Sequence, residues 1–410
     1  MERSACRSCG TVLRHVFVDL GSAPLSNAFL KPADLDAPEI YYPLKVVFCH
    51  ECFLVQLPTF ESPENIFSDY PYFSSYSETW LEHVDRFAAS AMNAFDMNST
   101  SLVVEVGSND GCLLAAFQRR GITVLGVEPA RNVAERAVDL GVPTIARFFN
   151  RDFALELVSD RGRVDLLIAN NVLAQVPELN GFIAGLKVAL APQGILSIEV
   201  PHLVRLMAET QFDTIYHEHF SYFCLTTVDR LLQRHGLAIF DVERLPTHGG
   251  SLRILAGHTE DRSKTRSDRV DAVEREEADE GYLTLEACAA FAERVMTARR
   301  NVLRFLIEAR DRGAAAVGYG APAKGNTLLN FCGVRSDLLH YTVDRSPHKQ
   351  GLFLPGSRIP VYAPERILET KPDLVLILPW NLRKEISSQL TAVREWGGRL
   401  AVAIPTVEVL

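Results

Sequence analysis

Several kinds of segment are missing from this 410-residue sequence. It has no uninterrupted apolar run of about 18 residues, so we expect no membrane span and no membrane partner. Its first residues, MERSACRSCG, lack the apolar core of a signal peptide, which favours a cytoplasmic location. The chain also lacks excess positive charge, since its net charge is −9. No affinity for nucleic acids is therefore expected. What is left is an ordinary globular protein, long enough for two or three domains.

Cysteine is scarce, and its distribution argues against a disulfide framework. Four of the eight cysteines form two C-x-x-C pairs near the N-terminus, and the other four are scattered. Two such pairs present four thiolates, the ligand set that zinc prefers, and four protein ligands leave no open position for a catalytic water. We therefore predict a structural Zn²⁺ site formed by Cys6, Cys9, Cys49 and Cys52. The alternatives are four buried, unligated cysteines, or a redox pair, although neither pair opens a helix after a strand.

The order of apolar segments predicts an α/β protein with three parts. Residues 1–66 are strand-like and rich in turns and form the zinc-binding module. From residue 101 apolar strands alternate with helices of about ten residues, which indicates a parallel sheet covered on both faces, a Rossmann-like arrangement. We assign this domain to residues 67–257. A second Rossmann-like α/β unit occupies residues 258–410, beginning with a densely charged stretch, 258–281, expected to be a solvated loop and a helix start.

A nucleotide site is expected where the first strand of the central domain ends, in SLVVEVGSNDG. Glycines in this turn let the backbone approach a ligand, and Glu128, which ends the next strand, can accept hydrogen bonds from a ribose diol. The motif G-x-G-x-x-G is absent, and Asp110 would repel a pyrophosphate while tolerating the ammonium and sulfonium groups of S-adenosylmethionine. The pattern therefore favours S-adenosylmethionine over NAD, with a ligand-free glycine turn as the alternative. The predicted cofactor contacts are Glu105, Gly107, Asn109, Gly111, Glu128, Phe148, Phe149, Asn170 and Asn171.

Groups that can carry or orient protons gather in the segment YHEHFSYF (216–223). A histidine can remove a proton from a carbon next to a ketone if a carboxylate fixes its tautomer. A tyrosine can donate a hydrogen bond to the developing enolate oxygen. The segment therefore suggests a catalytic role for Tyr216, Glu218 and His219. The alternatives are a cluster with only structural partners and a second zinc site, for which the spacing of the two histidines is unsuited.

Eight ordered motifs carry a resemblance that covers essentially the whole chain. They are the paired C-x-x-C knuckles, APLSNAFL, YPYFSSYS, EVGSNDG, GVEP, YHEHFSYF, THGGSLR and GYGAPAKGNTLLN. The chain resembles the three-domain S-adenosylmethionine-dependent sugar C-methyltransferases, which methylate C3 of nucleotide-linked 4-keto-deoxysugars. The resemblance implies a class I methyltransferase fold for the central domain. It also implies a C-terminal domain that closes over the sugar nucleotide without binding the methyl donor.

The resemblance also implies roles for individual residues. His219 is the expected base for the C3 proton, with Glu218 beside it, and Tyr72 is placed close to the reacting carbon. The loop GYGAPAKGN (318–326) suits a pyrophosphate, with Lys324 as its cationic contact. Thymidine diphosphate is the usual nucleotide of the family. Several relatives have a histidine at the position of Gln175, which cannot act as a base near neutral pH.

Further residues are predicted to contact the substrate. Arg253 in HGGSLR would face a phosphate or carboxylate, and Arg345 and Lys349 would contact the base or diphosphate. Ordinary glycine-bend and solvated-loop interpretations remain open for these segments. The full predicted substrate set is Tyr76, Gln175, His248, Arg253, Lys324, Asn326, Arg345 and Lys349. We expect a monomer or a weak homo-oligomer.

Three other functions compete with enolate-dependent methylation at C3 of a 4-keto-6-deoxysugar. An O- or N-methyltransferase of a small molecule would need no acidic C–H bond. An NAD-dependent sugar-nucleotide oxidoreductase would use the GYG unit, but that unit lacks a third glycine and no acidic residue ends its next strand before Asp344. A non-catalytic zinc-ribbon protein would not need the nucleotide loop.

Overall fold

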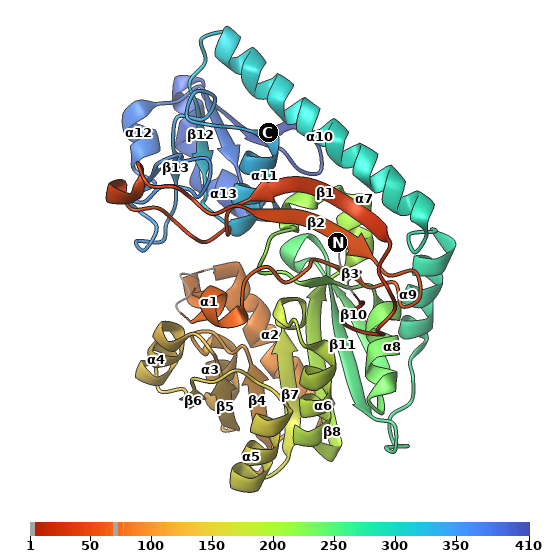
Figure 1. Ribbon diagram of the computed structural model, residues 1–410. Coiled ribbons are helices and arrows are strands. Elements are labelled where there is room, and N and C mark those ends of the chain that lie inside the picture. Colours follow the sequence, from red (N-terminus) through yellow and green to blue (C-terminus); the bar gives the residue numbers. More distant parts are fainter. Residues whose placement is uncertain (1–4, 69–72, 77) are drawn as a thin grey trace.

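The computed structural model describes residues 5–68, 73–76 and 78–410. Three sheets organise the chain, and Figure 1 shows the C-terminal domain above, the central domain below and the N-terminal strands between them. The predicted mixed α/β architecture, with a zinc-binding module and two Rossmann-like domains, is confirmed. Among the described residues, no helix combines the length and apolarity needed to span a bilayer.

The central domain contains a seven-stranded sheet. The inner strands of this sheet are largely buried, which explains why they appear in the sequence as continuous apolar runs. All neighbouring strands are parallel except β11, which runs antiparallel between β8 and β10. In spatial order the strands are β10 (Leu237–Leu245), β11 (Ser251–His258), β8 (Leu190–Pro201), β7 (Val164–Asn170), β4 (Leu102–Val106), β5 (Thr123–Val127) and β6 (Thr144–Ile145). The helices of this domain are α2 (Glu78–Ala94), α3 (Cys112–Gln118), α4 (Arg131–Asp139), α5 (Arg151–Arg161), α6 (Leu179–Ala189), α7 (Leu203–Ala208) and α8 (Leu225–Arg234).

The strand order of this sheet reverses direction between β4 and β7. In open parallel sheets, ligands bind outside the carboxyl ends of the strands at such a reversal. The polar residues that follow β4 and β7 therefore lie where a ligand is expected.

The C-terminal domain has a six-stranded sheet with its own reversal, between β12 and β15. Only β17 is antiparallel to its neighbour. The strands are β14 (Val361–Tyr362), β13 (Thr342–Val343), β12 (Ala316–Tyr319), β15 (Leu374–Ile377), β16 (Arg399–Val402) and β17 (Glu408–Val409). Four helices accompany it, α10 (Leu285–Asp311), α11 (Ala323–Cys332), α12 (Arg366–Thr370) and α13 (Arg383–Gln389).

The N-terminal module packs on both larger domains. Its sheet is completed by a strand from the central domain, in the order β1 (His15–Ala23), β2 (Tyr42–Phe48), β3 (Val55–Gln56) and β9 (Ser221–Tyr222). Phe17 of β1 stacks on Phe291 of α10 with ring centroids 4.8 Å apart. The cysteine pairs instead join the core of the central domain. A short helix, α1 (Pro63–Phe67), closes the module.

The charged stretch 258–281 differs from its expectation. Half of it forms helix α9 (Asp268–Asp279), whose Val270 and Val273 are buried in the core of the central domain. Two valines three residues apart lie on one helical face, and this narrow stripe is sufficient to dock the helix.

Candidate active site

The four predicted zinc ligands lie together. Their Sγ atoms all lie within 4.8 Å of one another, with Cys6 and Cys52 3.6 Å apart and Cys9 and Cys49 also 3.6 Å apart. Sulfurs about 2.3 Å from a tetrahedral zinc ion are separated by roughly 3.8 Å. The geometry and the ligand type therefore fit a structural zinc site, as the sequence predicts.

The zinc knuckles are fixed to the central domain by several polar contacts. Arg7, inside the first pair, donates to the backbone carbonyls of Leu57 and Phe220, each at 2.6 Å. Thr227 of α8 donates to the carbonyl of Cys52 at 3.2 Å. The metal site thus stabilises the region that follows the segment 216–219.

The turn after β4 has the backbone shape of a ligand-binding loop. Gly107, Asn109 and Gly111 have φ values of 68°, 49° and 76°. A Cβ atom on Gly107 would lie 2.2 Å from Cγ2 of Val172, so a side chain is excluded there. The segment η2 (Ser74–Tyr76), which precedes this turn in the chain, covers the loop. Ser74 N–H donates to Asn109 Oδ1 at 2.8 Å, and Ser75 N–H donates to Asp110 Oδ2 at 3.0 Å.

Buried polar side-chain atoms without partners, most of them acceptors, line the same sheet edge. Glu105 Oε2, Asp110 Oδ1 and Asn171 Oδ1, together with both side-chain polar atoms of Asn170, make no hydrogen bond within the described chain. Such atoms are costly to bury unless a ligand satisfies them. The ammonium and ribose hydroxyl groups of S-adenosylmethionine are donors that suit these acceptors.

Carboxyl groups dominate the electrostatics of this edge. Burial, together with the charges of Glu128, Asp110 and Glu199, holds the pKa of Glu105 well above its usual range. Burial raises the pKa of Glu128 to about 7, although its carboxylate accepts the backbone N–H groups of Asn109 and Ala130, both at 2.9 Å. Because the raised pKa values keep protons on these carboxyl groups, a cationic ligand, which stabilises their ionised forms, is favoured over the pyrophosphate of NAD.

The two predicted adenine contacts differ in burial. Phe149 is 8% exposed and packs edge-on against Phe153 and Phe182 inside the core. Its ring therefore belongs to the core of the central domain, and its contact with adenine stays a prediction. Phe148 is half-buried and remains the candidate contact.

The segment that follows η4 (Phe212–Thr214) carries the predicted proton-transfer groups. The Nδ1 atom of His219 lies 3.1 Å from the carbonyl oxygen of Thr214, so Nδ1 carries the proton and Nε2 is left with a lone pair. Tyr216 Oη lies 3.0 Å from that Nε2, and the two rings are 4.1 Å apart. Burial lowers the pKa of His219 to about 4, and the charges of His248 and Lys324 act in the same direction. The imidazole is neutral at pH 7.

The carboxylate of Glu218 has a different partner from the one expected. The carbonyl of Thr214 fixes the tautomer of His219, whereas the sequence suggested that a carboxylate would do so. Glu218, which is 1% exposed, accepts hydrogen bonds from the side-chain amide of Asn27 in the N-terminal module.

This loop joins the edge of the central sheet to the C-terminal domain. Phe220 N–H donates to the carbonyl of Ala174 at 2.7 Å, in the segment η3 (Leu173–Gln175) that follows β7. On the other side, Trp380 donates its indole N–H to Asp213 Oδ2 at 2.7 Å. The segment that carries His219 is thus hydrogen-bonded to the residues that follow β7 and to those that follow β15, which are strands at the two reversals of strand order.

Lys324 lies at the reversal in the C-terminal sheet. Its Nζ donates to Asn381 Oδ1 at 2.9 Å and lies 4.8 Å from the ring centroid of Trp380. Burial lowers the pKa of Lys324, and the charge of Asp213 opposes this shift. Burial raises the pKa of Asp213 itself to about 6.

The loop containing His248 packs against the same tryptophan. His248 has φ of 54°, and a Cβ on Gly249 would lie 2.4 Å from the Trp380 ring. Trp80 of α2 lies beside His248, with ring centroids 5.8 Å apart. His248 therefore belongs to the same group as His219 and Lys324.

Arg253 has partners that the sequence did not reveal. It is 6% exposed, and its Nε donates to Glu199 at 2.9 Å and its Nη1 to Glu243 at 2.9 Å. His83 of α2 also contacts Glu199 at 3.0 Å. Two carboxylates neutralise the guanidinium, so the expectation that Arg253 faces a substrate phosphate is not met. His83 and Glu199 were not predicted as partners of Arg253, because neither lies in a sequence motif that indicates this pairing.

The remaining substrate candidates have varied surroundings. Asn326 is buried and donates to the carbonyl of Ser26 at 2.6 Å, which makes it a link to the N-terminal module rather than an exposed substrate contact. Lys349 is also buried and donates to the carbonyl of Ala321 at 2.9 Å, so it braces the GYGAPA loop. Arg345 lies 3.8 Å from Glu385.

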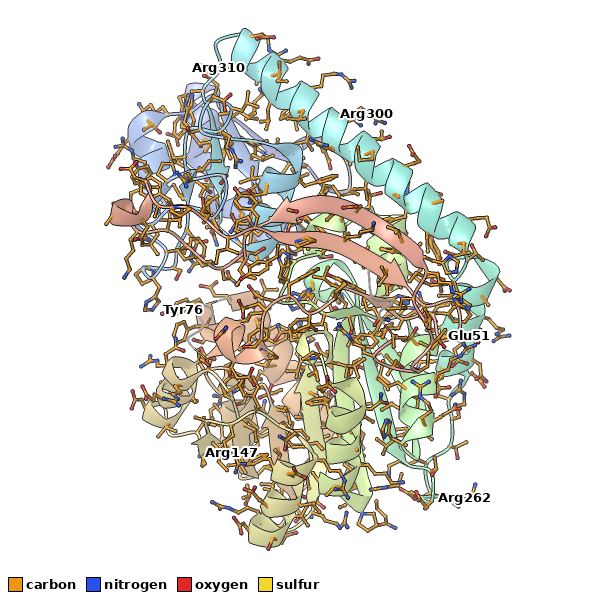
Figure 2. The ribbon with its side chains drawn as sticks, viewed as in Figure 1. Glu51, Tyr76, Arg147, Arg262, Arg300 and Arg310 are labelled. Carbon is orange, nitrogen blue, oxygen red and sulfur yellow. The ribbon has the colours of Figure 1, made fainter. Side chains whose placement is uncertain are left out.

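The last candidates lie near the junction of the domains. Gln175 is half-buried at the end of η3. Tyr76 is 49% exposed, and Figure 2 shows it where the central and C-terminal domains face each other. Tyr72 lies outside the described residues.

Three family models match the chain in succession. "Putative zinc binding domain" matches residues 6–67, "Methyltransferase domain" matches residues 74–242, and "C-methyltransferase C-terminal domain" matches residues 246–405. The chain is 36% identical to C-methyltransferase NovU of Streptomyces niveus over 408 residues, which is 99% of this chain and 96% of that protein.

Other similarities are confined to part of the chain. A ubiquinone biosynthesis O-methyltransferase of Rhodopseudomonas palustris is 24% identical over 148 residues, or 31% of this chain and 58% of that protein. Among solved structures, the PH0226 protein of Pyrococcus horikoshii superposes with a TM-score of 0.36 and 14% identity, over 48% of this chain and 99% of that one.

Proposed function

We propose, from the premise that this chain belongs to the S-adenosylmethionine-dependent C-methyltransferase family of NovU, that it methylates C3 of a nucleotide-linked 4-keto-6-deoxysugar. The observation that carries this proposal is the arrangement of His219 and Tyr216. A neutral imidazole lone pair and a phenol O–H lie 3.0 Å apart, next to Lys324. A base and an oxyanion donor at that separation suit a carbon acid next to a ketone.

The chemistry follows from the protonation states of these groups. Bound S-adenosylmethionine supplies an electrophilic methyl group on a sulfonium. His219 Nε2 accepts the C3 proton, and the C–H electron pair becomes an enolate with its oxygen on C4. Tyr216 turns its O–H from Nε2 to that oxygen. C3 would then bond to the methyl carbon while the bond from that carbon to sulfur breaks, its electron pair remaining on sulfur in a neutral thioether, and the imidazolium returns its proton to solvent.

The low pKa of His219 has a consequence for this step. A histidine with a pKa of about 4 is fully in its base form at pH 7 but is a weak base. Burial is the main cause of the low pKa, and an anionic diphosphate close to Lys324 would offset only the smaller contribution from the charge of that lysine. Binding of the sugar nucleotide is therefore expected to strengthen the base where the substrate needs it.

The C-terminal reversal offers a place for that diphosphate. Gly320 has φ of 88°, and helix α11 begins three residues later without a side-chain cap on its first N–H groups. Helix N-termini of this kind bind phosphates. Lys324 lies in the first turn of this helix, so the site supports a sugar diphosphate as substrate. The nucleoside expected from the family resemblance is thymidine.

The competing functions receive less support. An O- or N-methyltransferase would need no acidic C–H bond, and membership of the C-methyltransferase family favours carbon as the acceptor. An NAD-dependent oxidoreductase would use the GYG unit, but Lys324 follows GYGAPA without the third glycine of the dinucleotide motif.

A substrate panel tests the proposal directly. Purified protein is incubated with S-adenosylmethionine and nucleotide-linked sugars that have or lack the 4-keto group. Mass spectrometry is expected to detect a gain of one CH₂ only for the 4-keto sugars, because only these have an acidic C3–H. Methylation of sugars without the ketone would contradict the enolate mechanism.

Binding of S-adenosylmethionine is expected to release a proton from Glu128 at about pH 6 but not at about pH 8. With a pKa of about 7 this carboxyl is mostly protonated at the lower pH, and a cationic ligand favours its ionised form. Calorimetry in two buffers of different ionisation enthalpy measures the release. Glu128→Gln is the control, and equal proton release by that variant would contradict the assignment.

A further inference from the structure

The side chain of Asn27 reaches from the N-terminal module to the catalytic loop. Its Nδ2 lies 2.7 Å from Oε1 and 3.0 Å from Oε2 of Glu218. The amide nitrogen of asparagine can only donate, so Asn27 is the donor and the carboxyl group of Glu218 accepts. We propose that Asn27 is a positioning residue for methyl transfer, holding the side chain of Glu218, the residue before His219 in the chain, in its orientation. This inference rests on the proposed function.

A tight turn presents the Asn27 side chain. Ala28 N–H donates to the Leu25 carbonyl at 3.1 Å, and Phe29 N–H donates to the carbonyl of Asn27 itself at 2.9 Å. The preceding residue, Ser26, is 4% exposed. The backbone on both sides of Asn27 is therefore restrained, and its amide is aimed before any substrate arrives.

Helix α11 braces both partners of this contact. Asn326 donates to the carbonyl of Ser26 at 2.6 Å, directly before Asn27. The next residue, Thr327, donates to the carbonyl of Ile215 at 3.0 Å, at the start of the loop that carries Glu218. Both side chains are 2% exposed. One helix thus sets the separation between the amide and the carboxylate.

The arrangement explains what a zinc module contributes to an enzyme whose cofactor and base lie in another domain. The module supplies one hydrogen-bond donor to a buried carboxyl group, and buried polar groups need such partners. That carboxylate is adjacent in sequence to the proposed base. The module is therefore part of the catalytic apparatus as well as of the fold.

Two substitutions separate hydrogen-bond donation from simple space filling. Asn27→Ala is expected to lower kcat, and the exchange of the C3 proton with solvent, by roughly 10- to 100-fold, as for loss of a hydrogen bond to a charged group. Asn27→Asp keeps the shape but loses the donor, so it is expected to be at least as impaired. The KM for the sugar nucleotide, the affinity for S-adenosylhomocysteine and the zinc content are expected to stay at wild-type values.

A double-mutant cycle shows whether Asn27 acts through Glu218. In a Glu218→Gln background, Asn27→Ala is expected to lower kcat by no more than about 3-fold further, because coupled residues are not additive. Full multiplication of the two single effects would overturn the inference, as would wild-type kcat in Asn27→Asp. Absence of turnover by the wild-type protein would instead refute the proposed function.

Asn180→Ala is the matched control. Asn180 of α6 also joins the two parts, donating to the carbonyls of Arg7 and Ser8 at 2.9 and 3.2 Å, beside the first zinc knuckle. Its loss is expected to leave kcat unchanged. A loss of kcat equal to that of Asn27→Ala would show that any weakened contact between the module and the central domain slows the enzyme, and would overturn the specific role of Asn27.

Discussion

Substitution of His219 by asparagine is expected to lower kcat by roughly 10²- to 10⁴-fold, the usual contribution of a general base. Asparagine has no lone pair basic enough to accept the C3 proton, but it can still donate to the Thr214 carbonyl that His219 contacts. The loop should therefore keep its shape. Turnover is measured by mass spectrometry, and binding of S-adenosylhomocysteine by calorimetry.

Binding by the His219 variant should stay near normal, because the predicted cofactor residues lie on the turn after β4 and at the ends of other strands. Tyr216→Phe provides the comparison, since it removes the O–H that lies 3.0 Å from Nε2 while keeping the ring. It is expected to cost roughly 10²- to 10³-fold in kcat, as for other oxyanion donors. Retained turnover in His219→Asn would remove this residue as the base.

Loss of one zinc ligand is expected to have the largest effect on stability. Cys49→Ser removes a buried thiolate from a four-sulfur site whose zinc-binding free energy is on the order of 10 kcal/mol. The variant should contain less than one zinc per chain and unfold at a lower denaturant concentration. Elemental analysis and chemical denaturation measure the two quantities.

The control for this variant is Cys288→Ala. Cys288 is equally buried, in α10, but lies outside the four-sulfur cluster. Its substitution should leave the zinc content unchanged and cost only the packing of one small side chain. Full zinc occupancy in Cys49→Ser would show that the four sulfurs do not act as one metal site.

Local features of the sequence predicted the parts of the site that depend on short spacings. The two C-x-x-C pairs indicated the four sulfurs, because each pair places two thiolates on one turn. The strand and turn of EVGSNDG indicated the loop after β4, including the positive φ values of Gly107 and Gly111. Alternation of apolar strands and helices indicated both parallel sheets.

Partnerships between distant residues could not be predicted in this way. The buried pairing of Arg253 with Glu199 joins residues 54 positions apart in adjacent antiparallel strands. Strand β9 of the central domain completes the N-terminal sheet, and only tertiary pairing creates this contact. Periodicity reports which face of an element is buried, not which element covers it, so the burial of Phe149 and Asn326 also escaped prediction.

Asn27 illustrates the same limit at the active site. It was part of the motif APLSNAFL, yet nothing in its neighbours indicated a carboxylate 191 positions away. The tautomer of His219 depends likewise on the Thr214 carbonyl, a backbone group that no residue pattern reveals.

Replacement of the hydrogen on C3 by the methyl group can be measured with a labelled substrate. The protein is supplied with S-adenosylmethionine and a 4-keto-6-deoxy sugar nucleotide that carries deuterium at C3, and the product is analysed by NMR. The account predicts a product with the methyl carbon bonded to C3 and no deuterium left there. A methylated product in which C3 retains its deuterium and the methyl group lies on oxygen or nitrogen would contradict it.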